Sequence, residues 1–107
     1  MIYIGIDLAW SPRNRTGGAV LRGGPSGGEF SAHALLGGDD EILTFIDTHG
    51  GDGPCIVGVD APLWVPNETG RRPGEAALAV SFQRYQAGAH PANRRLLARN
   101  GVVRGEA

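Results

Sequence analysis

The chain has 107 residues, about the size of one small domain, and a second domain with its own core is not expected. Hydrophobic residues make up 41% of it and charged residues 20%, a balance that excludes a disordered or fibrous protein. The net charge of −1 hides an asymmetry, because residues 1–66 carry eight acids and three arginines whereas residues 67–107 carry three acids and seven arginines. Such a division suits a site for both a metal cation and a phosphate-bearing substrate, and it equally suits two complementary faces of one domain.

The sequence contains no segment typical of export or of membrane insertion. The start of the chain lacks a basic region and already reaches an acid at Asp7, unlike a secretory signal peptide. No apolar run approaches the roughly 18 residues of a membrane span. The single cysteine, Cys55, lies in an apolar run and is expected to be a buried thiol. We therefore expect a cytoplasmic protein with no membrane partner.

The first third of the chain predicts three β-strands joined by tight connections. Large apolar residues alternate with small or polar ones over Ile2–Leu8, which is the pattern of a strand with one buried face. Further strands are predicted at Gly18–Arg22 and Glu29–Leu36, on either side of a glycine-rich turn over residues 23–28. Strands joined by such short connections form an antiparallel meander.

A helix and a fourth strand follow this meander. Asp39 is suited to cap a helix that ends near His49, where two glycines stop it. The continuous apolar run Cys55–Val59 is typical of a central strand covered on both faces. A meander followed by a helical crossover places this fourth strand parallel to the first. The fold class is therefore predicted to be α/β with a mixed sheet.

The remainder of the chain predicts two helices separated by glycine. One begins at Pro73, and its expected buried face consists of Leu78, Phe82 and Tyr85. The other begins at Pro91 and runs to about Arg99. Both helices follow the fourth strand and complete the predicted order of elements.

One short pattern occurs twice, at the ends of the first and fourth strands. It consists of an apolar residue, glycine, a β-branched residue and aspartate, in Ile4–Asp7 and Val57–Asp60. Residues i and i+2 share a face of a strand, so each aspartate stands beside a glycine that leaves room for a ligand. On neighbouring parallel strands, about 4.8 Å apart, two carboxylates repel each other unless a cation lies between them. The pattern predicts a shared Mg²⁺ or Mn²⁺ site; the alternative is that each aspartate only caps the following loop.

The other candidate residues lie between positions 71 and 94. Arg71 and Arg72 precede a helix start, which is a natural phosphate-binding position, although two solvated loop arginines have the same pattern. Glu75 is a candidate metal ligand or, alternatively, an acid that complements the helix dipole. Three further residues are candidates for contact with substrate, and the first of them also suits a helix cap: His90, Asn93 and Arg94.

Four phrases in the chain together resemble a known family. They are Gly5–Trp10, Gly58–Leu63, Gly70–Pro73 with Glu75, and Ala89–Arg94. In this order, and over most of the chain, they resemble the domain of unknown function 429 family, whose members are described as predicted nucleases with a ribonuclease H-like fold. The resemblance implies a three-stranded antiparallel meander, a crossover helix, a parallel fourth strand and C-terminal helices.

Ribonuclease H-like enzymes carry one catalytic aspartate on the first strand and another acid at the end of the fourth. Asp7 and Asp60 match these two positions. The fold also has a fifth strand and usually a last acid on a C-terminal helix, neither of which is evident before Ala107. We therefore expect residues 1–107 to form a single ribonuclease H-like domain that is truncated at its C-terminus.

These observations lead to the interpretation that the chain is a metal-dependent nuclease or phosphodiesterase acting on nucleic acid or another phosphoester. Asp7 and Asp60 would hold one or two Mg²⁺ or Mn²⁺ ions that activate a water and stabilise the leaving oxygen. Arg71 and Arg72 would bind a phosphate, and Glu75 would be a catalytic residue that helps to hold the metal or its water. One alternative is a phosphotransferase of the sugar-kinase and actin-like superfamily, in which the segment Arg15–Gly18 would approach the phosphates of a nucleotide. Another is a non-catalytic binding module of the same fold. Metal titration separates the binding module from the two enzymes, and nucleotide binding separates the enzymes from each other.

Overall fold

Alternating apolar residues build a four-stranded sheet in the first part of the chain. The computed structural model describes all residues from 1 to 107, which form two compact units, 1–61 and 62–107, described here one at a time. The strands of the first unit are β1 (Ile2–Asp7), β2 (Thr16–Gly24), β3 (Gly27–Leu36) and β4 (Cys55–Asp60). Their order in the sheet is β3-β2-β1-β4, with an antiparallel meander of β1, β2 and β3 and a parallel pairing of β1 with β4. This confirms the predicted mixed α/β sheet and is consistent with a ribonuclease H-like layout.

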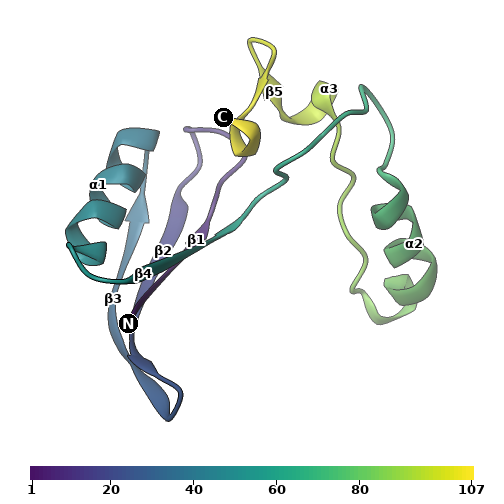
Figure 1. The fold of residues 1–107 in the computed structure, drawn as a ribbon. Helices are drawn as coiled ribbons and strands as arrows, with labels where there is room; N and C mark the ends of the chain where they lie inside the picture. The colour runs from purple at the N-terminus through teal and green to yellow at the C-terminus, as the bar shows by residue number, and fades with distance from the viewer. The chain divides into compact units, whose positions relative to one another are not determined.

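One helix, α1 (Asp39–Gly50), joins β3 to β4 and covers one face of this sheet (Figure 1). Its Ile42 and Phe45 are buried against apolar side chains of β1, β2 and β3. The packing is close enough to require glycine at position 18, because a Cβ there would lie 2.9 Å from the Phe45 ring. The buried residues of this core are Ile4, Ile6, Val20, Leu36, Ile42 and Phe45. We call this side of the sheet the closed face and the other side the open face.

Strand β4 lies at the edge of the sheet, so the prediction of a central strand covered on both faces is wrong. It has β1 on one side and no strand on the other. Ile56, Val57 and Val59 are 53%, 39% and 43% exposed. Cys55 is half-buried beside the core rather than fully buried. A continuous apolar run indicates that both faces of a strand are apolar, but it does not indicate which strands and helices pack beside it.

The meander is longer than the sequence predicts, because the glycines of its turn belong to the strands. Gly23 pairs with Gly28 and Gly24 with Gly27, so the turn shrinks to two residues. Thr16 lies before the predicted start of the second strand at Gly18, but it begins β2 and is fully buried. The predicted helix is confirmed, except that Asp39 is its first residue and the preceding glycine is its N-cap.

The second unit combines short elements around a small core. It contains α2 (Pro73–Phe82), η1 (Gln83–Tyr85), α3 (Arg94–Leu97), the β5 (Ala98–Arg99) and β6 (Val102–Val103) hairpin, and η2 (Arg104–Glu106). Its buried apolar residues are Val65, Ala92, Leu97 and Val103. No helix in either unit has the length and apolar character needed to cross a bilayer.

Two expectations for this second unit are wrong. Leu78, Phe82 and Tyr85 do not form a buried face, since they are 44%, 45% and 63% exposed. The last helix begins at Arg94 instead of Pro91 and ends at Leu97, where the chain turns into a hairpin. The spacing of apolar residues identifies a helical face, but whether that face is covered depends on distant parts of the chain.

Candidate metal and substrate site

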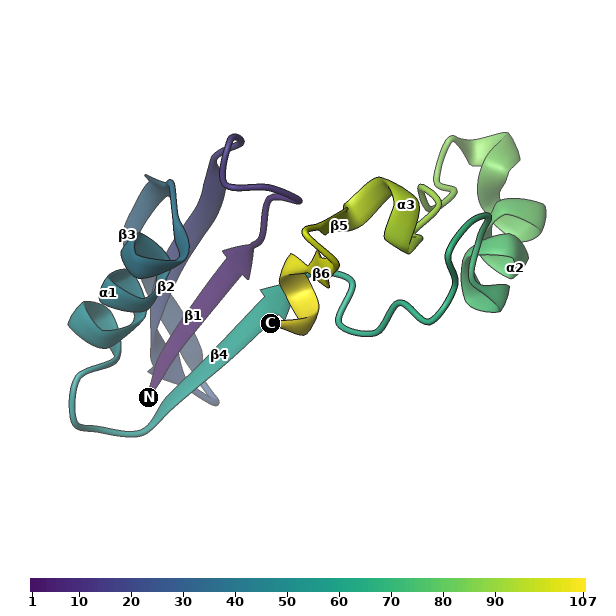
Figure 2. The same ribbon diagram turned by 90° about the horizontal axis from the view of Figure 1, so that it is seen from above.

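Asp7 and Asp60 lie side by side at the ends of two parallel strands. In the register of β1 with β4, Gly5 is the partner of Gly58 and Asp7 the partner of Asp60, and the two strands point the same way (Figure 2). The pairing continues past them, because the Leu8 N–H donates to the Asp60 carbonyl oxygen at 3.1 Å. Neighbouring strands lie about 4.8 Å apart, so the two carboxylates share one end of one face. This is the geometry that the repeated sequence pattern predicts.

Both carboxylates stand on the open face of the sheet. The alternation of β1 buries Ile4 and Ile6 on the closed face and leaves Gly5 and Asp7 on the open one. Asp60 is exposed as well, and no group of the protein donates a hydrogen bond to either carboxylate or forms an ion pair with it. The two acids therefore have no structural partner and are accessible to a ligand.

A groove of about 830 Å³ lies over this end of the open face. Gly5 and Gly58 form part of its floor, and the space above them is open, since a Cβ built on either residue would meet no atom within 4 Å. All four strands contribute to the lining, which includes Asp7, Gly17, Ala19, His33, Leu35 and Asp60. Sequence reasoning did not identify His33, although its alternation with buried Leu36 and half-buried Ala34 places it on the open face. The groove joins the two carboxylates to a surface without large side chains.

The carboxylate pair fits a hard divalent cation that takes only some of its ligands from the protein. The structure contains no group of three or more His, Cys, Asp or Glu side chains placed to hold one ion. Two carboxylates nevertheless supply the oxygen donors that Mg²⁺ and Mn²⁺ prefer. Mg²⁺ commonly keeps several waters and completes its shell with substrate phosphates. The residues present therefore fit a two-carboxylate site that water and substrate complete.

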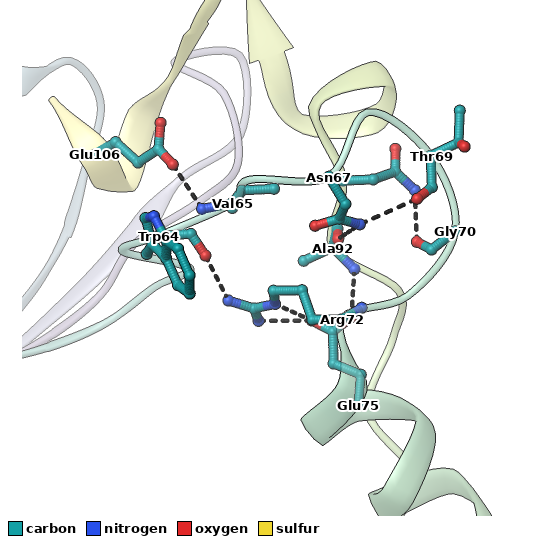
Figure 3. A network of polar contacts seen from close by, with 10 residues as sticks. Trp64, Val65, Asn67, Thr69, Gly70, Arg72, Glu75, Ala92 and Glu106 are labelled. Atoms are coloured by element: carbon teal, nitrogen blue, oxygen red, sulfur yellow. Dashed lines mark hydrogen bonds and ion pairs between the residues drawn. The ribbon is translucent and has the colours of Figure 1, made fainter.

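Glu75 belongs to the second unit, where it is buried and ties two loops together. Its carboxylate accepts hydrogen bonds from the backbone N–H groups of Arg72 and Ala92, each at 3.0 Å. It also pairs with the Arg72 guanidinium, which reaches the Trp64 carbonyl oxygen at 3.0 Å (Figure 3). Burial alone would raise the pKa of Glu75, but the hydrogen bonds from Ala92 and Arg72 and the charge of Arg72 outweigh it and lower the pKa. These contacts are structural, and the metal-binding role of Glu75 stays a prediction.

Asn93 and Arg94 also form contacts within the second unit. The Asn93 side chain caps α3 by accepting from the Leu96 N–H at 3.0 Å, and it donates to the Gly70 carbonyl oxygen at 3.0 Å. Arg94 forms an ion pair with Glu106 at 2.7 Å. The capping role that the sequence suggested for His90 thus falls to Asn93, and contact of these residues with substrate stays a prediction.

Two residues that sequence reasoning missed complete this network. The Glu106 carboxylate, besides its ion pair, accepts a hydrogen bond from the Val65 N–H at 2.6 Å. The Asn67 amide donates to the carbonyl oxygens of Thr69 and Ala92 at 3.1 and 3.0 Å. Each joins loops distant in the chain, so no local pattern identifies them. Polar contacts therefore supplement the small apolar core of this unit.

Arg71 and His90 line one small pocket of the second unit, about 270 Å³ in volume, beside Gln83 and Gln86. Both side chains are exposed, and neither is bound to another group of the protein. A guanidinium and an imidazole at one pocket are suited to an anion. Of the substrate-binding candidates, these two are brought together and remain accessible.

Comparisons with known proteins give one match. The family model described as a protein of unknown function (DUF429) matches residues 5–105. No curated protein matches the chain, and no solved structure matches it. The matched residues include the whole set of candidates, from Asp7 to Arg94.

Proposed function

The chain belongs to the DUF429 family of proteins of unknown function, and we propose that it is a metal-dependent nuclease that hydrolyses phosphodiester bonds. The observation that carries this proposal is the register pairing of Asp7 with Asp60 at the end of the open face. Two accessible carboxylates without internal partners, beside a floor of glycine, are suited to an ion and to a phosphate that approaches it.

In this proposal, each candidate residue has a separate role in binding the metal or the substrate. Asp7 and Asp60 would hold Mg²⁺ or Mn²⁺, which when bound lowers the pKa of a water and stabilises the leaving oxygen of an in-line displacement. Gly5 and Gly58 keep the backbone of the site uncovered, so that a bulky phosphodiester reaches the carboxylates. In the second unit, Arg71 and His90 are separate candidates for binding a phosphate, since Arg72 and Arg94 already pair with glutamates.

The contacts of Thr16 argue against the phosphotransferase alternative. Its hydroxyl accepts a hydrogen bond from the Ala9 N–H at 3.1 Å, and its side chain is fully buried. This contact ties the loop after β1 to the start of β2. A hydroxyl used in this way is not presented to a nucleotide phosphate.

The proposal is tested with short single-stranded DNA and RNA, incubated with the full chain in Mg²⁺ or Mn²⁺. We expect cleavage that chelation of the metal abolishes and that Asp7→Asn and Asp60→Asn each reduce by about 100-fold or more. Asp52→Asn is the matched control, because Asp52 is an exposed acid in the loop before β4 and should leave the rate unchanged. Metal-independent cleavage, or equal rates in all three variants, contradicts the proposal.

A further inference from the structure

Two glycines face each other on β1 and β4, although packing does not require either of them. Gly5 and Gly58 are register partners, one step along the open face from the two aspartates. Neither has a positive φ, and a Cβ at either would enter open space. Gly18 on the closed face differs, because a ring of α1 lies against it. Glycine weakens a strand and often marks close approach to its backbone, so the pair indicates a ligand outside the chain.

His33 stands at the other end of the same row of residues. The register runs from His33 through Ala19 and Gly5 to Gly58, across all four strands. All four residues line the groove, and nothing larger than a methyl group stands between the imidazole and the edge of β4. The distance from β3 to β1 is two strand spacings, about 10 Å. This is the scale of a nucleotide from its phosphate to its base.

The imidazole of His33 is exposed and has an aromatic neighbour. Phe30, on the same strand, lies with its ring centroid 5.6 Å from that of His33, and the planes are inclined by 31°. Phe30 is itself 58% exposed. It begins a row of exposed apolar side chains in register across the open face: Phe30, Leu21, Tyr3 and Ile56. Exposed rings beside an uncovered floor are suited to stacking on nucleobases.

We propose that the open face binds single-stranded nucleic acid, with a phosphate at Asp7 and Asp60, the sugar-phosphate chain over Gly5 and Gly58, and a base against His33. The proposed function supplies the phosphate end, and the inference adds the class of substrate and a substrate-binding residue. A single strand fits better than a duplex, because only unpaired and unstacked bases present their faces to a side-chain ring. The imidazole also offers a donor and an acceptor to a base edge.

The test measures the affinity of the full chain for a short fluorescent single strand in Ca²⁺, by anisotropy. We expect His33→Ala to weaken binding by about 5-fold or more, the loss of one stacked base. Gly58→Val should weaken it further, because its side chain fills the floor, while the melting temperature is maintained. His49→Ala is the matched control, since His49 also contacts a phenylalanine ring, at 4.6 Å, but belongs to α1 on the closed face.

Unchanged affinity in both His33→Ala and Gly58→Val overturns the inference. The inference is also overturned if Gly58→Val changes the self-association of the chain, measured by analytical ultracentrifugation, without changing its affinity for the single strand. The open face would then be an interface with a second copy of the chain. Cleavage in Mn²⁺ by the same proteins distinguishes the two proposals. If the wild-type chain cleaves and His33→Ala binds normally, only the role of His33 is contradicted. If the wild-type chain binds through His33 but does not cleave, the nuclease proposal is contradicted and the binding site is retained.

Discussion

The two units of the molecule use their charged side chains in opposite ways. In the first unit, Asp7 and Asp60 are exposed on one sheet face, without internal partners. In the second unit, the buried carboxylate of Glu75 pairs with the half-buried Arg72 and accepts hydrogen bonds from backbone N–H groups. An acid in a suggestive position is therefore informative about chemistry only once its partners are known.

The difference follows from how each unit is stabilised. The first unit has a sheet and a helix around an apolar core, so its open face is not required for folding. The second has a core of four buried apolar residues, which is small for a unit of this length. Hydrogen bonds to Glu75 and Glu106 join its loops in addition to that core. Substitutions on the open face of the first unit should therefore alter binding, whereas substitutions of the paired residues Glu75, Arg72 and Glu106 in the second unit should alter stability.

The largest effect is expected for metal binding by the first unit. An ion held only by the native carboxylate pair raises the free energy of unfolding by about 2.7 kcal/mol when its concentration is 100 times its dissociation constant. Mn²⁺ or Mg²⁺ should thus raise the melting temperature of the wild-type chain, and Asp60→Asn should remove most of this rise. Calorimetric scans with and without the metal measure it. An equal rise in the variant would exclude Asp60 as a ligand.

The second prediction concerns the buried acid of the other unit. Glu75→Gln replaces a charged acceptor by an amide and should destabilise residues 62–107 by about 2 kcal/mol at neutral pH. Hydrogen exchange at the Ala92 amide, which donates to Glu75, reports this loss. Glu68→Gln is the control, because Glu68 is exposed.

The pH dependence of the same variant fixes its cause. The pKa of Glu75 is lowered by folding, so the stabilisation by its charge is complete above the ordinary value of 4.5. It is lost as the pH falls through the lowered pKa of the folded state. The difference between wild type and Glu75→Gln should therefore shrink below about pH 4.5. A difference that stays constant with pH would mean that the charge of Glu75 is unimportant.

A pair of glycine substitutions compares the two faces of the sheet. Gly18→Ala places a Cβ 2.9 Å from the Phe45 ring and should destabilise the protein by about 1–3 kcal/mol. Gly58→Ala enters open space and should be neutral or stabilise by about 0.5–1 kcal/mol. Urea denaturation curves measure both. If Gly58→Ala lowers the free energy of unfolding more than Gly18→Ala does, the open face is covered by another part of the chain.

The smallest effect is expected from the two neighbouring arginines. Arg71→Ala should reduce the slope of log affinity against log salt for a single strand by about 0.7, if Arg71 contacts one phosphate. It should leave stability unchanged, because the side chain is exposed and unpaired. Arg72→Ala should do the reverse, lowering stability through loss of its pair with Glu75. Identical behaviour of the two variants would remove this distinction.

Much of the first unit was predictable, because its signals are local. The repeated pattern ending in Asp7 and Asp60 gave the shared face, since alternation along a strand and a helical crossover are regular geometry. The edge position of β4 was not predictable, because apolar residues do not reveal which strands pair with them. His33 was overlooked because a single histidine in a strand has no distinctive pattern.

The second unit was less predictable, because its contacts join distant residues. Glu75 and Arg72 are three residues apart and form a recognisable helix-start pair. The bond from the Ala92 N–H, however, spans 17 residues, and the bond from Val65 to Glu106 spans 41. Nothing in a one-dimensional pattern distinguishes a glutamate bound in this way from a metal ligand. Only the three-dimensional contacts separate the two interpretations.

Paramagnetic broadening by Mn²⁺ in the amide spectrum tests the central claim most directly. If Asp7 and Asp60 share the ion, substoichiometric Mn²⁺ should first broaden the amide signals of these residues and of Gly5 and Gly58, and Asp7→Asn should remove the effect. The competing acidic cluster is residues 39–41, in the first turn of α1. Broadening centred on that turn, with the signals at the ends of β1 and β4 unchanged, would contradict the account.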